Sequence, residues 1–300
     1  MGLLQETCDA IHSRSKEIEQ HIIKNWNDAS DSKQYGRLVS MVAQYGAATN
    51  QKNVTIPKPC MIIASADHGV ADMGVSAYPK ETTVGMTQNY LIPKGAGANS
   101  LANYCGATME VIDMGIDADM SWVPGLRSHK LGMGTKNFVE EPAMTREQAI
   151  EGIETGIKLV QEKMSDGYNV FLVGEMGISN TTASALMTAK FAGLTAEEAT
   201  GRGTNISDER LKLKQRIVHD VLVKYKDIPK DDAIGILAAV GGFEFTCIVG
   251  VILGAAAHHG MVIIDGFNTS ACALVAKTLV PASMDYVMAS HLSAEKAAKS

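Results

Sequence analysis

Five short apolar runs constrain the fold more than any other feature of the sequence. They read MIIASA, MEVIDM, NVFLVG, MVIID and DYVMAS, and they lie between Met61 and Ser290. Because polar residues do not alternate regularly with apolar ones in these runs, they predict strands that are covered on both faces, as in a parallel sheet. Helical stretches separate the runs, so the sequence predicts an α/β fold.

Each of these runs ends in a polar or glycine-containing segment. The segments are residues 67–69, 113–117, 174–177, 265–266 and 290–293. The carboxyl ends of parallel strands share one edge of the sheet, where ligands bind. We therefore expect these distant segments to meet at one site.

The first fifty residues have a different pattern. Apolar positions recur among charged ones at helical spacing, with a polar break over residues 27–34. Pro57 and Pro59 mark the change to the strand-containing part of the chain. This predicts a helical segment of a small domain over residues 1–55 and an α/β domain over residues 56–300.

Composition argues against several classes of function. The net charge of −6 and the lack of a basic, aromatic-containing stripe argue against a nucleic-acid partner. The longest apolar stretch, residues 243–257, contains Glu244 and Thr246, so it predicts a buried helix and no membrane span. Five scattered cysteines without a C-x-x-C pair indicate a reducing cytoplasm. No His/Cys cluster has ligand spacing, so we expect no metal site.

Several segments could bind phosphate. Glycine turns at residues 95–97, 201–203 and 241–242 precede predicted helices, whose first N–H groups can hold an anion. Taken alone, each turn is more commonly structural, but three of them on one sheet edge shift the balance towards binding. Lys214 is either a phosphate clamp or part of a solvated helix face, with Leu213 towards the core and Lys212 in water. Asn180 and Thr181 open a helix after Glu175 and are either caps or phosphate contacts.

The histidines and the known motifs add little chemistry. His68 and His291 follow strands and could act as acid or base, but we favour a role in holding the strand-end turns, because no Ser or Cys nucleophile motif accompanies them. Neither a P-loop nor a G-x-G-x-x-G motif is present, so an NTPase or dinucleotide enzyme is not supported.

Nine motifs in order resemble one family. They are ADHGV, GVSAYPKETT with MTQNYL, GAGANSLA, DMGID, GEMGISNTTASAL, GRGT, GGFE, IDGFNTSACAL and SHLSAEK. This set closely resembles the nicotinate-nucleotide:dimethylbenzimidazole phosphoribosyltransferases, which assemble the lower ligand of cobalamin. The resemblance runs from about Met61 to the last residue.

The resemblance implies a fold and a reaction. The fold would be a Rossmann-like parallel sheet with helices on both faces, plus a small helical domain, and the protein would pair with an identical or homologous subunit. The reaction would transfer 5-phosphoribose from nicotinate mononucleotide to a benzimidazole-type base, without a metal or redox cofactor.

It also implies site residues. Glu175 and Lys214 match the ribose-phosphate site. The phosphate-site loops match Gly177, Gly203 and Ser293, with Asn180, Thr181 and Ser290 beside them, and the wall of the base pocket matches Pro79, Lys80, Met86 and Gln88. Lys80 departs from the small or uncharged residue that is usual in relatives, and so it could alter which base is accepted.

A second departure concerns the catalytic base. The family's usual glutamate lies in a later G-E-G segment that these 300 residues do not contain. We consider three explanations, in this order: the sequence is part of a longer chain, the protein works with a complete homologue, or Glu175 acts as a substitute base. The alternative function is a non-catalytic subunit that scaffolds such a homologue.

Overall fold

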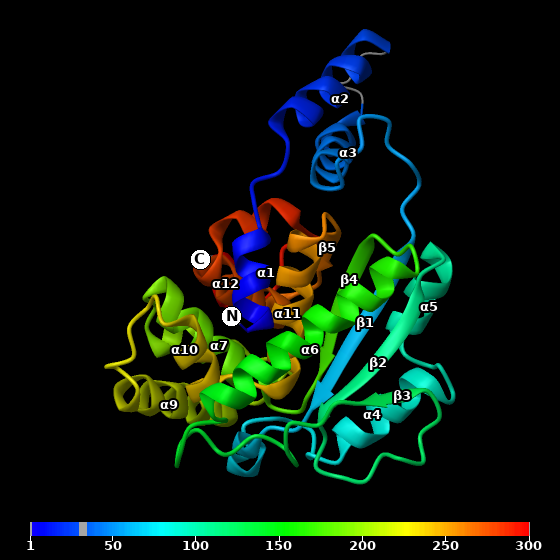
Figure 1. Cartoon of the computed structure of the whole chain (residues 1–300). Helices are drawn as coiled ribbons and strands as arrows, with labels where there is room; N and C mark the ends of the chain where they lie inside the picture. The colour runs from blue at the N-terminus through cyan, green and yellow to red at the C-terminus, as the bar shows by residue number, and fades with distance from the viewer. Residues whose placement is uncertain (1, 30–34, 300) are drawn as a thin grey trace.

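A parallel sheet forms the centre of the molecule (Figure 1). In the computed structural model, which describes residues 2–29 and 35–299, six strands lie in the order β3-β2-β1-β4-β5-β6 and all their pairings are parallel. The strands are β1 (Pro59–Ala66), β2 (Thr108–Gly115), β3 (Leu126–Ser128), β4 (Val170–Met176), β5 (Met261–Ile264) and β6 (Val287–Ala289). All five predicted runs are confirmed as strands. The sequence analysis missed β3, because three residues are too few to show a pattern.

Helices separate the strands, as expected for parallel pairing. They are α1 (Leu3–Ala10), α2 (Lys16–Ala29), α3 (Arg37–Ala48), α4 (Thr82–Leu91), α5 (Gly97–Cys105), α6 (Arg146–Ser165), α7 (Asn180–Ala192), α8 (Ala196–Ala199), α9 (Asp208–Lys224), α10 (Ala233–Val240), α11 (Phe243–Ala257) and α12 (Phe267–Leu279). Short 3-10 helices are η2 (Gly69–Met73), η3 (Pro281–Tyr286) and η4 (Lys296–Lys299).

Helices cover both faces of the sheet, as predicted. Successive side chains of a strand point to opposite faces, and β1 shows this directly. Ile62 and Ala64 belong to the main core with α6 and α11, whereas Ile63 packs in a second cluster with Tyr90 of α4. The apolar composition of β1 follows from burial on both sides.

The main core depends on close packing between α6 and α11. Gly156 of α6 faces Gly250 of α11, and a Cβ on Gly156 would lie 2.9 Å from the Cα of Gly250 and 2.1 Å from the carbonyl oxygen of Cys247. Side chains at these positions would force the helices apart. Two glycines therefore set the distance between the longest helix and the buried helix that lies against the sheet.

We expect Gly156→Ala to destabilise the protein by about 3 kcal/mol, because the added methyl group overpacks backbone that cannot move alone. The matched control is Gly85→Ala in α4, where an added Cβ meets nothing within 4 Å. There the same change should stabilise by up to about 1 kcal/mol through helix propensity. Urea unfolding of both variants measures this, and a similar small effect at both positions would contradict the packing account.

The helices of the first fifty residues, predicted from sequence, are confirmed, but they do not behave as one body. α1 packs against α6 and α11, and α2 packs on α3 (Figure 1, top), whereas α3 also contacts η3 and contributes Tyr45 and Ala48 to the main core. The predicted break at residues 27–34 is wrong in its first part, because α2 continues to Ala29, and residues 30–34 lie outside the described residues. The domain boundary at residues 55/56 remains a proposal.

The apolar stretch over residues 243–257 is the buried helix α11, as predicted, and all but the last of its fifteen residues are buried. Within the part of the chain that the structure describes, no helix combines the length and the apolar character needed to cross a bilayer.

Candidate active site

Glu175 lies at the carboxyl end of the sheet and is held by two asparagines. It is the next-to-last residue of β4, beside Ala64 of β1. Its Oε1 accepts a hydrogen bond of 2.9 Å from the Nδ2 of Asn268, at the start of α12, and its Oε2 accepts one from the Nδ2 of Asn180, at the start of α7. The Nδ2 of Asn268 also donates to the Oδ1 of Asn180 at 3.0 Å, and the Oδ1 of Asn268 accepts a hydrogen bond from the Oγ of Ser184. The amides fix the direction of the carboxylate.

The environment of Glu175 favours its neutral form. Burial raises the pKa of this carboxyl to about 7, the hydrogen bonds from Asn268 and Asn180 oppose the rise, and the negative charges of Glu244 and Asp265 add to it. A carboxyl group with a pKa near 7 can exchange a proton at physiological pH. Glu175 therefore has the ionisation expected of a general base.

A second group, which we call the candidate anion site, consists of Lys214, Gly203 and Thr181, the residue after Asn180 in α7. The Nζ of Lys214 donates a hydrogen bond of 2.7 Å to the Oγ1 of Thr181. The backbone N–H of Gly203 lies beside them and donates at 2.9 Å to the Oε1 of Glu295. A backbone donor and a buried lysine thus lie side by side, and the backbone donor binds a carboxylate of the chain itself.

Lys214 is almost fully buried, with 1% of its surface exposed. Burial lowers its pKa to about 8, and the negative charge of Glu295 opposes this shift. The interpretation of Lys214 as part of a solvated helix face is therefore wrong. The predicted core position of Leu213 is also wrong, because this residue is 38% exposed. The buried residues Ile217, Val218 and Val221 follow Lys214 at helical spacing, and this pattern could have revealed its direction.

The anion site requires glycine. Gly203 has a φ of +54°, which side chains other than those of glycine and a few polar residues rarely adopt. A Cβ there would lie 2.7 Å from the Oγ1 of Thr181 and 3.4 Å from the Nζ of Lys214. At Gly201 a Cβ would overlap the carboxylate of Glu295. The glycines therefore leave room for the Glu295 carboxylate, and the binding of an external anion at this turn stays a prediction.

The two predicted serines are near these groups. Ser290 follows β6 and donates from its Oγ to the carbonyl of Asp265 at 3.2 Å, and the Oγ of Ser293 accepts from the backbone N–H of Glu295 at 3.2 Å. Ser290 also lines a cavity of about 400 Å³ with Glu175. Ser293 thus supports the segment that carries Glu295.

This cavity lies along the face of the sheet that carries α4 and α5. Its walls are mainly apolar, with Glu175, Asp265 and Ser290 as polar groups: Met61, Ile63, Tyr90, Ala98, Leu101, Cys105, Leu172, Val173, Gly174, Glu175, Ile263, Ile264, Asp265 and Ser290. Its size suits a small aromatic ligand. Burial and the nearby charge of Glu175 raise the pKa of Tyr90 to about 12, so this phenol stays neutral.

The residues predicted for the base pocket separate into two places. Met86 packs with Tyr90 in the apolar cluster beside this cavity, and Gln88 lies on the same helix, α4. Lys80 instead forms an ion pair of 2.6 Å with Asp117, in a different cavity over the ends of β1 and β2. Pro79 is exposed. The structure does not bring Lys80 together with Met86, and the effect of Lys80 on base choice stays a prediction.

The two histidines after strands differ. His291 is exposed and shares a hydrogen bond with the Oγ of Ser290 at 2.8 Å. His68 is completely buried, and its Nε2 lies 2.7 Å from the Oε1 of Glu244. The sequence predicted a turn-holding role for both and contained no sign that His68 has a charged partner 176 residues away.

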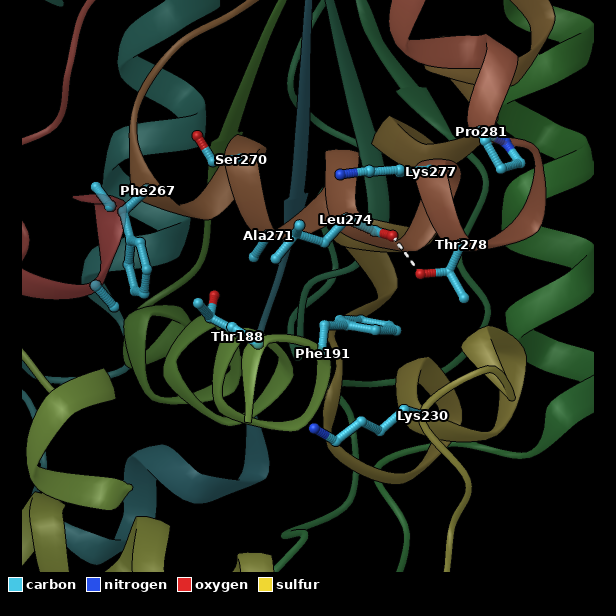
Figure 2. Close-up of a pocket in the computed structure, with 13 residues that line it drawn as sticks. Thr188, Phe191, Lys230, Phe267, Ser270, Ala271, Leu274, Lys277, Thr278 and Pro281 are labelled. Atoms are coloured by element: carbon cyan, nitrogen blue, oxygen red, sulfur yellow. Dashed lines mark hydrogen bonds between the residues drawn. The ribbon is translucent and has the colours of Figure 1, made fainter. Parts of the chain in front are cut away.

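A separate cavity of about 530 Å³ lies between α7 and α12 (Figure 2). Phe191 of α7 faces Leu274 of α12, and Lys277 and Lys230 lie at the edges of the cavity. It contains none of the predicted site residues. Among residues 2–29 and 35–299, no group of three or more His, Cys, Asp or Glu side chains is arranged to hold a metal ion.

Sequence reasoning missed two polar residues of the site. Asn268 lies in IDGFNTSACAL, where an asparagine shortly after a strand-end glycine follows the same design as Asn180. Glu295 lies in SHLSAEK, whose carboxylate could not be assigned a place without the fold. Both belong to segments that already carried the resemblance.

The fold and the site define a Rossmann-like α/β protein whose buried polar groups Glu175 and Lys214 lie near the carboxyl edge of its parallel sheet. Consistent with this class, a family model described as Phosphoribosyltransferase matches residues 11–300. The chain belongs to the nicotinate-nucleotide–dimethylbenzimidazole phosphoribosyltransferase family.

Individual relatives support this membership. The chain is 43% identical over 261 residues to the nicotinate-nucleotide–dimethylbenzimidazole phosphoribosyltransferase of Chloroflexus aggregans, covering 87% of this chain and 73% of that protein. It is 44% identical over 260 residues to the protein of the same name from Geobacter sulfurreducens, with the same coverage. The crystal structure of CobT from Thermus thermophilus superposes with a TM-score of 0.88 at 31% identity, over 94% of this chain and 84% of that one.

Proposed function

We propose that this protein transfers 5-phosphoribose from nicotinate mononucleotide to a benzimidazole-type base, forming an α-ribazole 5′-phosphate and nicotinate for cobalamin biosynthesis. The observation that carries this proposal is the group of Gly203, Lys214 and Thr181: the Gly203 N–H donates to the Glu295 carboxylate, and beside it the buried Lys214 donates to Thr181. The names of the relatives supply the substrates, and the two neighbouring sites supply a place for each of them.

The 5′-phosphate takes the position of the Glu295 carboxylate. A phosphate is larger and more highly charged, and it can accept hydrogen bonds from the Gly203 N–H and from the Lys214 ammonium group together. Glu295 belongs to the segment after β6 and must move aside when the nucleotide binds. Lys214 gains a stronger partner in the exchange, which favours its protonated form.

The aromatic base lies in the apolar cavity, with Glu175 at its polar end. Met86 and Tyr90 border this region from α4, and a flat ring can stack between apolar side chains there. In this arrangement Glu175 lies between the base and the phosphoribosyl group. Its raised pKa, about 7, suits acceptance of the proton of the base.

The reaction balances with these groups. The bond between C1′ of the ribose and the ring nitrogen of nicotinate breaks, and its electron pair stays on that nitrogen, so the positively charged pyridinium becomes neutral nicotinate ring. A ring nitrogen of the base forms the new bond to C1′, and the proton on its other ring nitrogen passes to the Glu175 carboxylate. The carboxylate also stabilises the positive charge that develops on the ribose.

The direct test incubates the purified chain with nicotinate mononucleotide and dimethylbenzimidazole and measures nicotinate and the new nucleotide by chromatography. Equal amounts of both products are the expected result. Binding of both ligands without turnover would contradict catalysis by this chain and favour the scaffolding function.

We also propose that the chain pairs with a second, identical or homologous subunit in the cytoplasm. Support comes from large apolar side chains on the surface of α5, where Leu101 is 63% and Tyr104 90% exposed. The five cysteines are all free thiols, which fits a reducing compartment.

A further inference from the structure

A buried ion pair lies directly behind the site. His68 and Glu244 are both fully buried, and the Nε2 of His68 lies 2.7 Å from the Oε1 of Glu244. His68 follows β1, and Glu244 lies in the first turn of α11, where the helix dipole favours a negative charge. The pair therefore joins the carboxyl end of β1 to the start of the buried helix α11.

The pair is in contact with the backbone of the site. A Cβ on Gly177 would lie 3.2 Å from the Cδ2 of His68 and 3.3 Å from the Oε1 of Glu244. On the other side, a Cβ on Gly242 would lie 2.5 Å from the Cε1 of His68 and 2.4 Å from the Oε2 of Glu244. Both positions thus need glycine. Gly177 comes two residues after Glu175, so only a short backbone segment separates the ion pair from Glu175.

Stability alone does not explain this pair. The desolvation free energy of two charges is about as large as the free energy of their attraction. A buried ion pair therefore often stabilises a protein no more than apolar residues would. Two of its polar atoms, the Nδ1 of His68 and the Oε2 of Glu244, have no hydrogen-bond partner among the described residues. Leaving these polar atoms unsatisfied at this depth costs free energy of folding. We therefore look for the role of the pair in its effect on neighbouring groups.

We propose that His68 and Glu244 are positioning residues for the transfer reaction, and that the balance of their two charges controls the ionisation of Glu175 across the Gly177 backbone. This inference deepens the proposed function and rests on it for its chemical meaning. The pair contributes no atom to the bonds that form or break.

The directions of the pKa shifts of His68 and Glu175 agree with this proposal. Although burial opposes the charged form, the carboxylates of Glu244, Asp67 and Glu175 raise the pKa of His68 above its ordinary value. The negative charge of Glu244 in turn is one of the causes that raise the pKa of Glu175. The other titratable groups that interact with Glu175 are Asp265 after β5, Tyr90 of α4 and Cys272 of α12.

Single substitutions should move the titration of Glu175 in opposite directions. Glu244→Gln removes a negative charge and should lower the midpoint by about one pH unit, whereas His68→Gln leaves the charge of Glu244 uncompensated and should raise it by a similar amount. The double variant H68Q/E244Q removes both charges and should return the midpoint close to that of the unaltered protein. A control variant, His219→Gln, alters an exposed His–Asp pair on α9 and should change nothing.

The measurement is the ¹³C NMR titration of glutamate carboxyl groups, with the Glu175 signal assigned by its loss in Glu175→Gln. It needs no substrate, so it separates failure of this inference from failure of the proposed function. If His68→Gln does not fold, as circular dichroism would show, Glu244→Gln and the double variant still give the test. Downward shifts in every variant would mean that the pair only excludes water, and unchanged midpoints would mean that it does not act on Glu175. Either result overturns the proposal.

Discussion

Replacing Lys214 by methionine is expected to weaken the binding of nicotinate mononucleotide on the order of 100-fold, since truncating one partner of a buried, charged hydrogen bond costs about 2–5 kcal/mol. Methionine keeps most of the volume of this buried side chain and removes only the ammonium group. Isothermal titration calorimetry measures the change. Nicotinate riboside, which lacks the phosphate, should bind equally to both proteins.

The matched control is Lys212→Met on the exposed face of the same helix, which should leave both affinities unchanged. The pH dependence gives a second measurement. The pKa of Lys214 is about 8, so its charge is present below that pH and is lost above it. The affinity of the unaltered protein for the nucleotide should therefore fall as the pH rises above about 8, and that of the methionine variant should not. Equal losses for nucleotide and riboside would place Lys214 in the structure of the site instead of at the phosphate.

Replacing Glu175 by glutamine is expected to lower kcat by a factor of about 10² to 10⁴, the usual contribution of a general base. Glutamine has the same shape and can still accept a hydrogen bond from Asn268 or Asn180, so the Kd of nicotinate mononucleotide should change by no more than about threefold. Rapid-quench measurement of nicotinate release gives kcat, and calorimetry gives Kd.

Glu209→Gln, an exposed change in the first turn of α9, is the control for the chemistry of the substitution. A large loss of nucleotide binding in Glu175→Gln would assign the carboxylate to ribose recognition. An unchanged kcat would assign proton removal to another group, and the role of Glu175 as a base would be wrong.

Much of the scaffold follows from local sequence pattern. The runs MIIASA and NVFLVG predicted β1 and β4 because strands buried on both faces must be apolar at nearly every position. The segments after them then had to meet, because parallel strands end at one edge. The strand β3 was not predicted, because it has only three residues and a strand pattern cannot be recognised in so short a segment.

The directions in which individual polar side chains point were harder to predict from the sequence. Lys214 lies on the buried face of α9 with Ile217 and Val218, but an aliphatic stem with a charge at its tip is usually exposed. The hydrogen bond to Thr181 and the negative charge of Glu295 oppose the cost of burying Lys214. The place of Lys80 also depends on a long-range partner, Asp117, which turns it towards the ends of β1 and β2.

Local sequence patterns were enough to predict the parallel sheet, the helices on both faces and the edge at which Glu175 lies, because these follow from periodicity and from the geometry of parallel strands. The contact of Glu295 with the Gly203 N–H and that of His68 with Glu244 behind Gly177 could be seen only in the folded chain. Such contacts join residues that are far apart in the chain. They depend on how whole helices and loops pack, and no local pattern of residues records that packing.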